Sequence, residues 1–386
     1  DEIKERIYAV TEDNDFLIIE LGGTVGDIEG LPFMEAIRSI RHELPKTNTM
    51  NIHLSLVPYI KAAGELKTKP TQHSVQELRR IGITPHMLVC RTERELPKAL
   101  KDKLALACDI DRNAVIEAGD AQSIYQVPLQ FIKEGILTPL SEHFNIKIKP
   151  NMEKWDTLVK NILLPQGEVT IAFVGKYLDL KESYKSLIEA LIHAGAHLST
   201  KVNIHWCDSE RIEDVGAYDI IGNSDAILVA GGFGQRGVNG KLAAIKYARE
   251  NKIPYLGICL GMQLAIIEFA KNVLGLEDAN SIEFDPNTKN PLIYLIDEFI
   301  DQSGNKQIRT HESPMGGTMR LGEYPFEPLK GTHLQKAYGN NEIYYERHRH
   351  RYEANPKYKQ VLEDAGMIIS GQSDGLIEAI EFKDHP

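Results

Sequence analysis

The sequence predicts a two-domain α/β protein in which both domains are built on mainly parallel sheets. The chain has 386 residues, 42% of them hydrophobic, which is enough for two cores rather than one. Short apolar runs typical of strands alternate with segments of helical spacing, as in parallel α/β folds. This alternation stops near residue 145 and begins again near residue 167, which indicates two domains.

The first domain is expected over residues 1–145. Its expected strands cover residues 15–21, 50–60 and 85–92, and its expected helices cover residues 33–44 and 74–83. The chain opens on Asp1 with a segment that reads as a helix already under way, and it stops just after an apparent strand. We therefore expect a fragment that is truncated at both ends.

Residues 146–166 are predicted to be a linker, because they hold prolines, basic residues and a short amphipathic helix. The second domain is expected over residues 167–386. Its first strand is predicted at 169–177 and the helix after it at 183–196. Two further strand–turn–helix units are expected at 224–237 and 253–270.

Composition excludes several classes of protein. The net charge of −11 argues against a nucleic-acid surface, although a local group of lysines can still bind a small anion. No apolar run approaches the roughly 18 residues of a membrane span, and no secretory signal opens the chain. The four cysteines have no paired spacing, which indicates a reduced, cytoplasmic protein without a disulfide framework or a zinc site.

One cysteine has the setting of a nucleophile. Gly257-Ile258-Cys259-Leu260-Gly261 lies between a predicted strand and a predicted helix. A sharp turn there presents the side chain, flanking glycines allow a close approach of the backbone, and the helix N-terminus favours the thiolate. A buried structural cysteine is the commoner case, and we keep that interpretation for Cys90, Cys108 and Cys207. For Cys259 the combined context favours catalysis.

A cysteine nucleophile normally needs a histidine base. The histidines after Cys259 are His311, His333, His348, His350 and His385. None stands at a strand end before an orienting carboxylate, so none is assigned as the base. We interpret His348 and His350, which lie in "ERHRHRYE" (346–353), as part of an anion-binding cluster, and we give His385 no catalytic role.

Several long motifs carry a family resemblance. "GGFGQRG" (231–237), "PYLGICLGMQLA" (254–265), "GGTMRLG" (316–322) and "ERHRHRYE" together resemble the glutamine amidotransferase domain of the CTP synthase family. "IELGGTVGDIEGLPF" (19–33) and "KTKPTQHSV" (67–75) resemble its amidoligase domain. The resemblance extends over essentially the whole chain. It implies an incomplete P-loop-type amidoligase domain followed by a class I glutamine amidotransferase domain.

The resemblance implies that the second domain hydrolyses glutamine. Cys259 would attack the side-chain amide, release ammonia and form a glutamyl thioester. Backbone donors of the oxyanion hole would come from Gly232 and Leu260. The resemblance further implies glutamine-binding positions at Gly232, Leu260, Gly261, Met262, Gln263, Glu283 and Arg351. A carboxylate suits the α-ammonium of glutamine and a guanidinium suits its α-carboxylate.

For the first domain, the resemblance implies ATP-dependent amination of UTP to CTP. Glu20 would bind Mg²⁺, and Gly119, Asp120 and Ala121 would contact ATP. We expect "KTKPTQ" to be a loop stiffened by Pro70. The implied UTP and CTP contacts are Asp27, Ile28, Glu29, Lys67, Thr68, Lys69, Pro70, Thr71, Gln72 and Lys103.

The implied partners are small molecules and further copies of the chain. They are UTP, ATP with Mg²⁺, glutamine, CTP as product and inhibitor, and GTP as an allosteric activator. The family also implies a homotetramer, with no nucleic-acid or membrane partner.

The sequence departs from the family pattern in two places. It contains no glycine-rich phosphate loop with its lysine, and no histidine–proline–glutamate motif that would supply the base. We therefore expect the polypeptide to hydrolyse glutamine slowly and to bind ATP poorly. Two alternatives stay open: another class I amidotransferase, against which the two amidoligase motifs argue, and a non-catalytic relative with an assembly or regulatory role, against which the intact cysteine turn argues.

Overall fold

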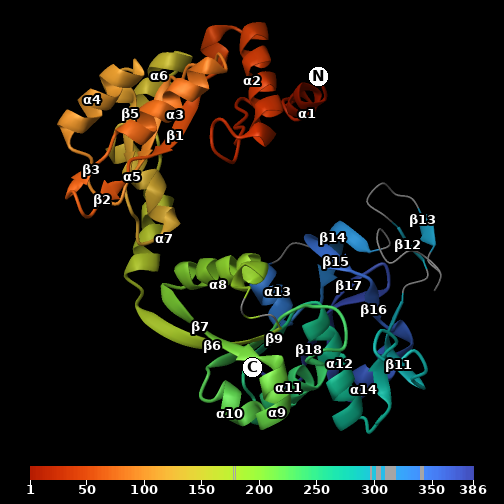
Figure 1. The fold of residues 1–386 in the computed structure, drawn as a ribbon. Coiled ribbons are helices and arrows are strands. Elements are labelled where there is room, and N and C mark those ends of the chain that lie inside the picture. Colours follow the sequence, from red (N-terminus) through yellow and green to blue (C-terminus); the bar gives the residue numbers. More distant parts are fainter. Residues whose placement is uncertain (177, 179, 296–297, 301–305, 309–318, 340–342) are drawn as a thin grey trace. The chain divides into compact units, whose positions relative to one another are not determined.

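The computed structural model describes all residues except 177, 179, 296–297, 301–305, 309–318 and 340–342 (Figure 1). The chain divides into two compact units, Asp1–Leu164 and Pro165–Pro386. Each unit contains a parallel sheet with helices, so the α/β fold class is confirmed. None of the described helices combines the length and the apolar character that crossing a bilayer requires.

Unit 1 is built on the parallel sheet β1-β4-β5, formed by β1 (Ile52–Leu56), β4 (Met87–Arg91) and β5 (Val115–Ala118). The central strand β4 is almost entirely buried. A two-stranded hairpin, β2 (Tyr59–Ile60) and β3 (Glu65–Leu66), follows β1. The helices are α1 (Glu2–Tyr8), α2 (Leu31–Glu43), α3 (Lys69–Arg80), α4 (Lys98–Cys108), α5 (Val127–Lys133), α6 (Leu137–Phe144) and α7 (Glu153–Leu163).

Two local predictions for unit 1 are wrong. Residues 15–21 form no strand, and Ile18 is 93% exposed, because a strand needs a hydrogen-bonded neighbour and none of the described strands pairs with this segment. The segment "KTKPTQ" is a loop only at its first two residues, because α3 already begins at Lys69. Proline is well suited to the first turn of a helix, where its missing N–H is not needed.

The helix expected within residues 146–166 is α7. The indole N–H of Trp155 on this helix donates to the carbonyl of Tyr125, 2.7 Å away, so α7 packs on unit 1. The division between the units follows directly after it.

Unit 2 is built on the parallel sheet β7-β6-β8-β9, formed by β6 (Gly167–Gly175), β7 (Thr200–Asp208), β8 (Ala226–Val229) and β9 (Tyr255–Gly257). α8 (Lys185–His197) covers one face of this sheet through Leu187 and Leu191. The other face is covered by α9 (Ser209–Val215), α10 (Ala217–Ile221), α11 (Val238–Asn251) and α12 (Leu260–Asn272) (Figure 1).

Smaller sheets complete unit 2. The first has the order β15-β14-β17-β18, formed by β14 (Arg320–Pro328), β15 (Tyr344–His350), β17 (Met367–Ser373) and β18 (Leu376–Phe382). The second has the order β10-β11-β16, formed by β10 (Ala279–Ser281), β11 (Asn290–Leu295) and β16 (Tyr352–Ala354). The remaining elements are the pair β12 (Glu298–Ile300) and β13 (Lys306–Ile308), and the helices α13 (His333–Tyr338) and α14 (Lys359–Asp364).

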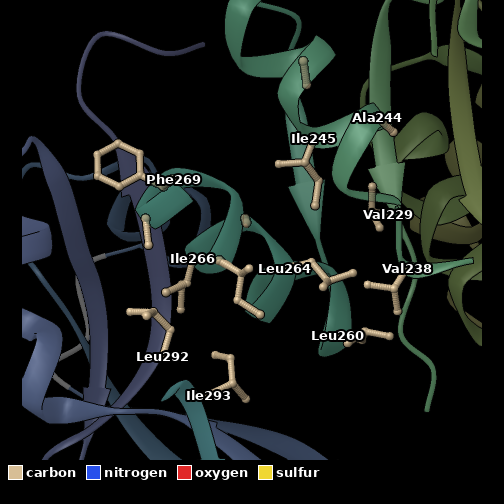
Figure 2. Packing of buried hydrophobic residues seen from close by; sticks show 14 of the residues in the cluster. Val229, Val238, Ala244, Ile245, Leu260, Leu264, Ile266, Phe269, Leu292 and Ile293 are labelled. Carbon is tan, nitrogen blue, oxygen red and sulfur yellow. The ribbon is translucent and has the colours of Figure 1, made fainter. Parts of the chain in front are cut away.

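Helix α12 is apolar on most of its circumference and is almost wholly buried. Figure 2 shows Leu260 and Leu264 on the side toward Val229 of β8 and Val238 of α11, and Ile266 on the side toward Leu292 of β11. A helix buried on several sides cannot shift without breaking its packing. The residue that precedes it, Cys259, is therefore held in a fixed place.

Candidate functional site

Cys259 forms a strained turn between β9 and α12. Its backbone has φ 55° and ψ −110°, a conformation that residues other than glycine rarely adopt. Such strain persists where the surrounding fold imposes it and is common at functional sites. The structure thus gives Cys259 the geometry of a nucleophile on a strand-to-helix turn.

The two glycines flanking Cys259 are required by packing. A Cβ atom on Gly261 would lie 2.2 Å from the carbonyl oxygen of Val229, and one on Gly257 would lie 2.6 Å from the hydroxyl of Tyr255. The Tyr255 hydroxyl in turn donates to the carbonyl of Gly261 at 2.8 Å. The turn can therefore close only with glycine at both positions.

Opposing effects act on the Cys259 thiol. Burial is the largest and raises its pKa, and the charge of Glu283 adds to this. The backbone N–H groups of Leu260 and Gly232 and the ammonium of Lys241 lower the pKa, and the net result is a raised pKa. The resting side chain is therefore a protonated thiol at neutral pH. The two N–H groups that act on Sγ are the two expected from the sequence as oxyanion donors.

The other expected glutamine-binding residues lie on segments around this cysteine. Met262 and Gln263 line a cavity of about 870 Å³ together with Cys259. The Gln263 amide donates to the carbonyl of Tyr352 at 2.8 Å. Glu283 and Arg351 both act electrostatically on the Tyr352 side chain, whose pKa is raised mainly by burial. The two predicted charge-recognition residues are thus both close enough to act on the same side chain, that of Tyr352.

Glu283 is also joined to the glycine-rich segment 231–234 that follows β8. One of its carboxylate oxygens accepts the N–H of Gly234 at 2.8 Å. A Cβ atom on Gly231 would lie 3.3 Å from Cβ of Cys259 and 3.8 Å from its Sγ. The segment therefore approaches the sulfur through its backbone, as an oxyanion-binding segment must.

His348 and His350 do not form an anion-binding cluster, which corrects the interpretation drawn from the sequence. Along β15 the arginines at 347 and 349 are exposed, whereas both histidines point inward and hydrogen-bond to each other at 2.8 Å. Burial, the charge of Arg320 and the charge of His350 lower the pKa of His348 to about 3. His348 is therefore neutral and cannot attract an anion by charge.

The two histidines belong to a buried network with two carboxylates. Arg320 Nη1 lies 2.5 Å from Glu378 and 3.6 Å from Glu353, and His350 Nδ1 lies 3.1 Å from Glu353. The ligand atoms of His348, His350 and Glu378 lie within 4.8 Å of one another. Because Arg320 already pairs with Glu378, this group reads as an internal ion-pair network and not as a metal centre.

The remaining histidines show no geometry of a base toward Cys259. His385 lies at the cavity wall, where its Nε2–H donates to the carbonyl of Ala248 at 3.1 Å. His333 also lines the cavity, and its backbone N–H donates to Glu381. His311 lies outside the described residues.

In unit 1 the predicted residues 67–72 and 119–121 follow the carboxyl ends of strands, the edge at which open α/β sheets bind ligands, whereas residues 27–29 precede β1 and Lys103 lies within α4. Lys67 comes after the hairpin that follows β1, and its N–H donates to the carbonyl of Pro58. The ammonium of Lys67 pairs with Glu65, and the charge of Lys103 also lowers the pKa of Glu65. Lys67 and Lys103 are thus brought to one place.

The first turn of α3 contains both exposed and buried candidates. Thr68, Thr71 and Gln72 are buried. The Gln72 amide donates to the Thr68 hydroxyl at 3.2 Å, and the Thr71 hydroxyl donates to the carbonyl of Leu56 at 3.1 Å. These three side chains shape the turn, whereas Lys69 and Pro70 are exposed at its surface.

The candidate magnesium residue, Glu20, comes shortly before the glycine-rich turn 22–26, and Asp27 follows that turn. The Asp27 carboxylate accepts the N–H of Thr24 at 2.9 Å and lies 3.5 Å from the Cβ position of Gly23. Glu20 lies 3.7 Å from the Cβ position of Gly22. Two hard oxygen donors thus border one pair of glycines, which fits a Mg²⁺ ion held by one or two carboxylates and by phosphates. The expected residues Ile28 and Glu29 follow in a short 3₁₀ helix with exposed side chains.

The candidate ATP contacts follow β5. Asp120 pairs with Arg91, which ends β4, at 2.5 Å. Arg91 also donates to the carbonyls of Thr92 and Ala118. Gly119 and Ala121 flank Asp120 on an irregular segment at the carboxyl edge of the sheet.

Two buried lysines near Cys259 were not predicted. Lys176 follows β6, and Lys241 lies in the first half of α11; each donates to carbonyl groups of the segment after β8. One sequence signal could have found Lys241. It occupies the buried row of α11, in helical spacing with Val238, Ala244, Ile245 and Ala248, where an unpartnered lysine is unexpected.

Comparisons with family models match both units. Residues 1–146 match the CTP synthase N-terminus, and residues 179–386 match the class I glutamine amidotransferase family.

Relatives match over the whole chain. CTP synthase of Sulfurimonas denitrificans is 64% identical over 386 residues, covering 100% of this chain and 71% of the relative. CTP synthase of Nautilia profundicola is 66% identical over 391 residues, covering 100% of this chain and 72% of the relative. A solved structure, the Trypanosoma brucei CTPS glutaminase domain with bound acivicin, is similar with a TM-score of 0.50 and 39% identity, over 55% of this chain and 81% of that one.

Proposed function

The chain belongs to the CTP synthase family, and on that premise we propose the reaction that its residues carry out. The reaction is ATP-dependent amination of UTP to CTP, with ammonia released from glutamine at Cys259. The observation that supports it most is the strained Cys259 turn, on which the N–H groups of Leu260 and Gly232 both converge. In the similar solved structure, the glutaminase domain holds acivicin.

In the glutaminase half-reaction, the Cys259 sulfur attacks the side-chain carbonyl carbon of glutamine. Leu260 and Gly232 stabilise the developing oxyanion through their N–H groups. The C–N bond then breaks, ammonia leaves and a thioester remains, which water hydrolyses to glutamate and the free thiol. Glu283 and Arg351 both act on the Tyr352 side chain, and they would bind the α-ammonium and the α-carboxylate.

The raised pKa of Cys259 means that a base must remove the thiol proton before the attack. We assign this role to none of the described histidines. His348 and His350 are held in the buried ion-pair network, and His385 donates to Ala248. The proton taken from the thiol leaves with the ammonia, so the step is balanced.

Two measurements on Cys259 test the glutaminase proposal. Replacing Cys259→Ala should abolish glutamine-dependent CTP formation and leave ammonia-dependent formation unchanged, because only the nitrogen source is lost. A glutamine-like chloroketone should label Cys259, as read by peptide mass spectrometry. The buried Cys90, Cys108 and Cys207 provide the internal control and should stay unlabelled. Equal loss of CTP formation with both nitrogen donors would refute the proposal.

In the amidoligase half-reaction, ATP phosphorylates the 4-oxygen of UTP, and ammonia then displaces that phosphate. We propose that Lys67, Lys69 and Lys103 bind the triphosphate at the start of α3, where helix N–H groups also favour anions. Glu20 and Asp27 would hold Mg²⁺, which neutralises phosphate charge when bound. Gly119, Asp120 and Ala121 would contact ATP.

Replacing Lys69→Ala tests the nucleotide site. We expect the KM for UTP to rise roughly tenfold, which corresponds to about 1.4 kcal/mol of lost binding, while glutamine hydrolysis stays the same. Lys154→Ala on the exposed face of α7 is the matched control and should change neither value. An unchanged KM for UTP in the Lys69 variant would exclude this lysine from the site.

Further family properties belong to the same proposal. They are a homotetramer, inhibition by CTP, activation by GTP and a cytoplasmic location. The free thiols of all four cysteines are consistent with a reducing compartment.

A further inference from the structure

Lys241 is a fully buried lysine that the proposed chemistry does not use. It lies on α11 and is among the largest completely buried side chains of the described chain. Its ammonium donates to the carbonyl of Ala230 at 2.7 Å and lies 3.5 Å from that of Gly231. These residues follow β8 directly and lead into Gly232, the oxyanion donor.

No carboxylate of the described residues is among the groups that act on the charge of Lys241. Two groups act on it electrostatically: the ammonium of Lys176, which opposes its charge, and the Cys259 thiol, which favours it. Burying an unpaired charge is costly, so proteins normally pair such a group or let it lose its proton. An anion at Cys259 would be the missing counter-charge.

The position of Lys241 also fixes the oxyanion segment. A Cβ atom on Gly232 would lie 3.7 Å from the Lys241 ammonium, and one on Gly231 would lie 3.8 Å from Cys259 Sγ. Lys176 holds the far end of the same segment through the carbonyls of Phe233 and Gly234, at 2.8 and 2.9 Å. Because the carbonyls on both sides of Gly232 point toward the two lysines, the N–H of Gly232 faces Cys259 Sγ.

We propose that Lys241 is a positioning residue of the Cys259 site: its ammonium holds the carbonyls before Gly232 so that the Gly232 N–H faces the sulfur, and its charge stabilises the anion formed there. This inference rests on the proposed glutaminase function. Lys176 also helps to hold the segment 231–234 in place through its hydrogen bonds to the carbonyls. The charge effect belongs to Lys241, because Lys241 and not Lys176 acts on the Cys259 thiol.

The protonation of Lys241 limits the pH range of the effect. Burial, with the charge of Lys176, lowers the pKa of Lys241 to about 8, and Cys259 acts in the opposite direction. The charge is therefore present below about pH 8 and is lost above it. Glu283 is the other charged group that acts on Cys259, and it acts against thiolate formation. Lys241 should thus accelerate thiolate chemistry at neutral pH and not at high pH.

The test is the pH profile of Cys259 alkylation by iodoacetamide, read by peptide mass spectrometry without glutamine or turnover. In Lys241→Met, whose unbranched side chain is one atom shorter and carries no charge, alkylation at pH 7 should slow about tenfold, equivalent to one pKa unit. The profiles of the variant and the unaltered protein should converge above pH 9. Lys246→Met, on the exposed side of the same helix, is the control and should follow the unaltered profile.

A second variant separates the effect of the charge from the effect of the hydrogen bonds to the carbonyls. It also tests the proposal if Lys241→Met does not fold. Lys241→Gln keeps an N–H donor for the carbonyls but carries no charge. It should slow alkylation as Lys241→Met does. Its kcat for glutamine hydrolysis should fall less than that of Lys241→Met, and its KM for glutamine should stay unchanged. Identical alkylation profiles in folded Lys241→Gln and unaltered protein would overturn the proposal. Because alkylation needs no glutamine, that result stays distinct from a failure of the glutaminase proposal itself.

Discussion

At Gly261 a single added methyl group would collide with the backbone of the parallel sheet. In an open helix, Gly→Ala is stabilising by roughly 0.5–1 kcal/mol. At this position the new Cβ would lie 2.2 Å from the Val229 carbonyl, so we expect Gly261→Ala to destabilise unit 2 by about 1–3 kcal/mol or more. Urea unfolding should therefore show that Gly261→Ala lowers the free energy of unfolding, where the same substitution in an open helix would raise it.

Gly167→Ala is the matched control for this substitution. Gly167 starts β6 and has nothing within 4 Å of its Cβ position. Its replacement should leave the free energy of unfolding nearly unchanged. If Gly261→Ala behaved like Gly167→Ala, the tight packing of α12 against β8 would be contradicted.

The residue scale also shows how far the sequence predicts the site. Cys259 could be found because its signal is local: two glycines, a strand before and a helix after lie within a few residues. Lys241 could not be found as easily, because its role depends on carbonyls of residues 230 and 231 brought close only by the fold. The inward direction of His348 and His350 was hidden by the arginines that alternate with them.

At the scale of elements, strand alternation on β15 makes the stability of unit 2 depend on pH. The folded pKa of His348 is about 3, below its ordinary value of 6.5, because of burial and the nearby charges of Arg320 and His350. A depressed pKa contributes stability above pH 6.5 that is lost as the pH falls toward 3. Glu378 contributes a pH dependence of stability with the opposite sign, because burial raises the pKa of its carboxyl group.

Replacing His348→Gln should remove this acid sensitivity. Between pH 7 and pH 5, we expect the variant to lose roughly 2 kcal/mol less free energy of unfolding than the unaltered protein. Urea unfolding at the two pH values measures the difference, and Glu378 is present in both proteins. His193→Gln, on the exposed part of α8, should keep the full pH dependence. An equal loss in His348→Gln would show that His348 is not the titrating group.

Elements also show why some predictions from sequence fail. Five of the seven strands in the two parallel sheets, β1, β4, β6, β8 and β9, were predicted, because buried parallel strands are apolar along their whole length, whereas β5 and β7 were not predicted. Residues 15–21 have the same composition, but composition alone does not supply the neighbour that a strand requires. The start of α3 was placed too late, because a proline read as part of a loop is equally suited to the first turn of a helix.

At the scale of the whole molecule, the two units have separate cores. Of the four buried clusters in the described chain, two lie entirely within residues 1–164 and two within residues 165–386. The candidate nucleotide residues all belong to the first unit and the Cys259 cavity is lined only by the second. Units with separate cores can unfold as separate cooperative systems.

We therefore expect calorimetry to resolve two unfolding transitions that respond to different ligands. UTP with Mg²⁺ should raise only the transition of unit 1, because a ligand at 100 times its Kd adds about 2.7 kcal/mol to the state that binds it. Labelling Cys259 with the chloroketone should raise only the transition of unit 2, and the Cys259→Ala protein treated in the same way should show no shift. A single transition moved by both ligands would mean that the two half-reactions share one folding unit. Two independent transitions would instead show that each core unfolds without the other. Glutamine hydrolysis and UTP amination could then be lost one at a time, because each depends on its own core.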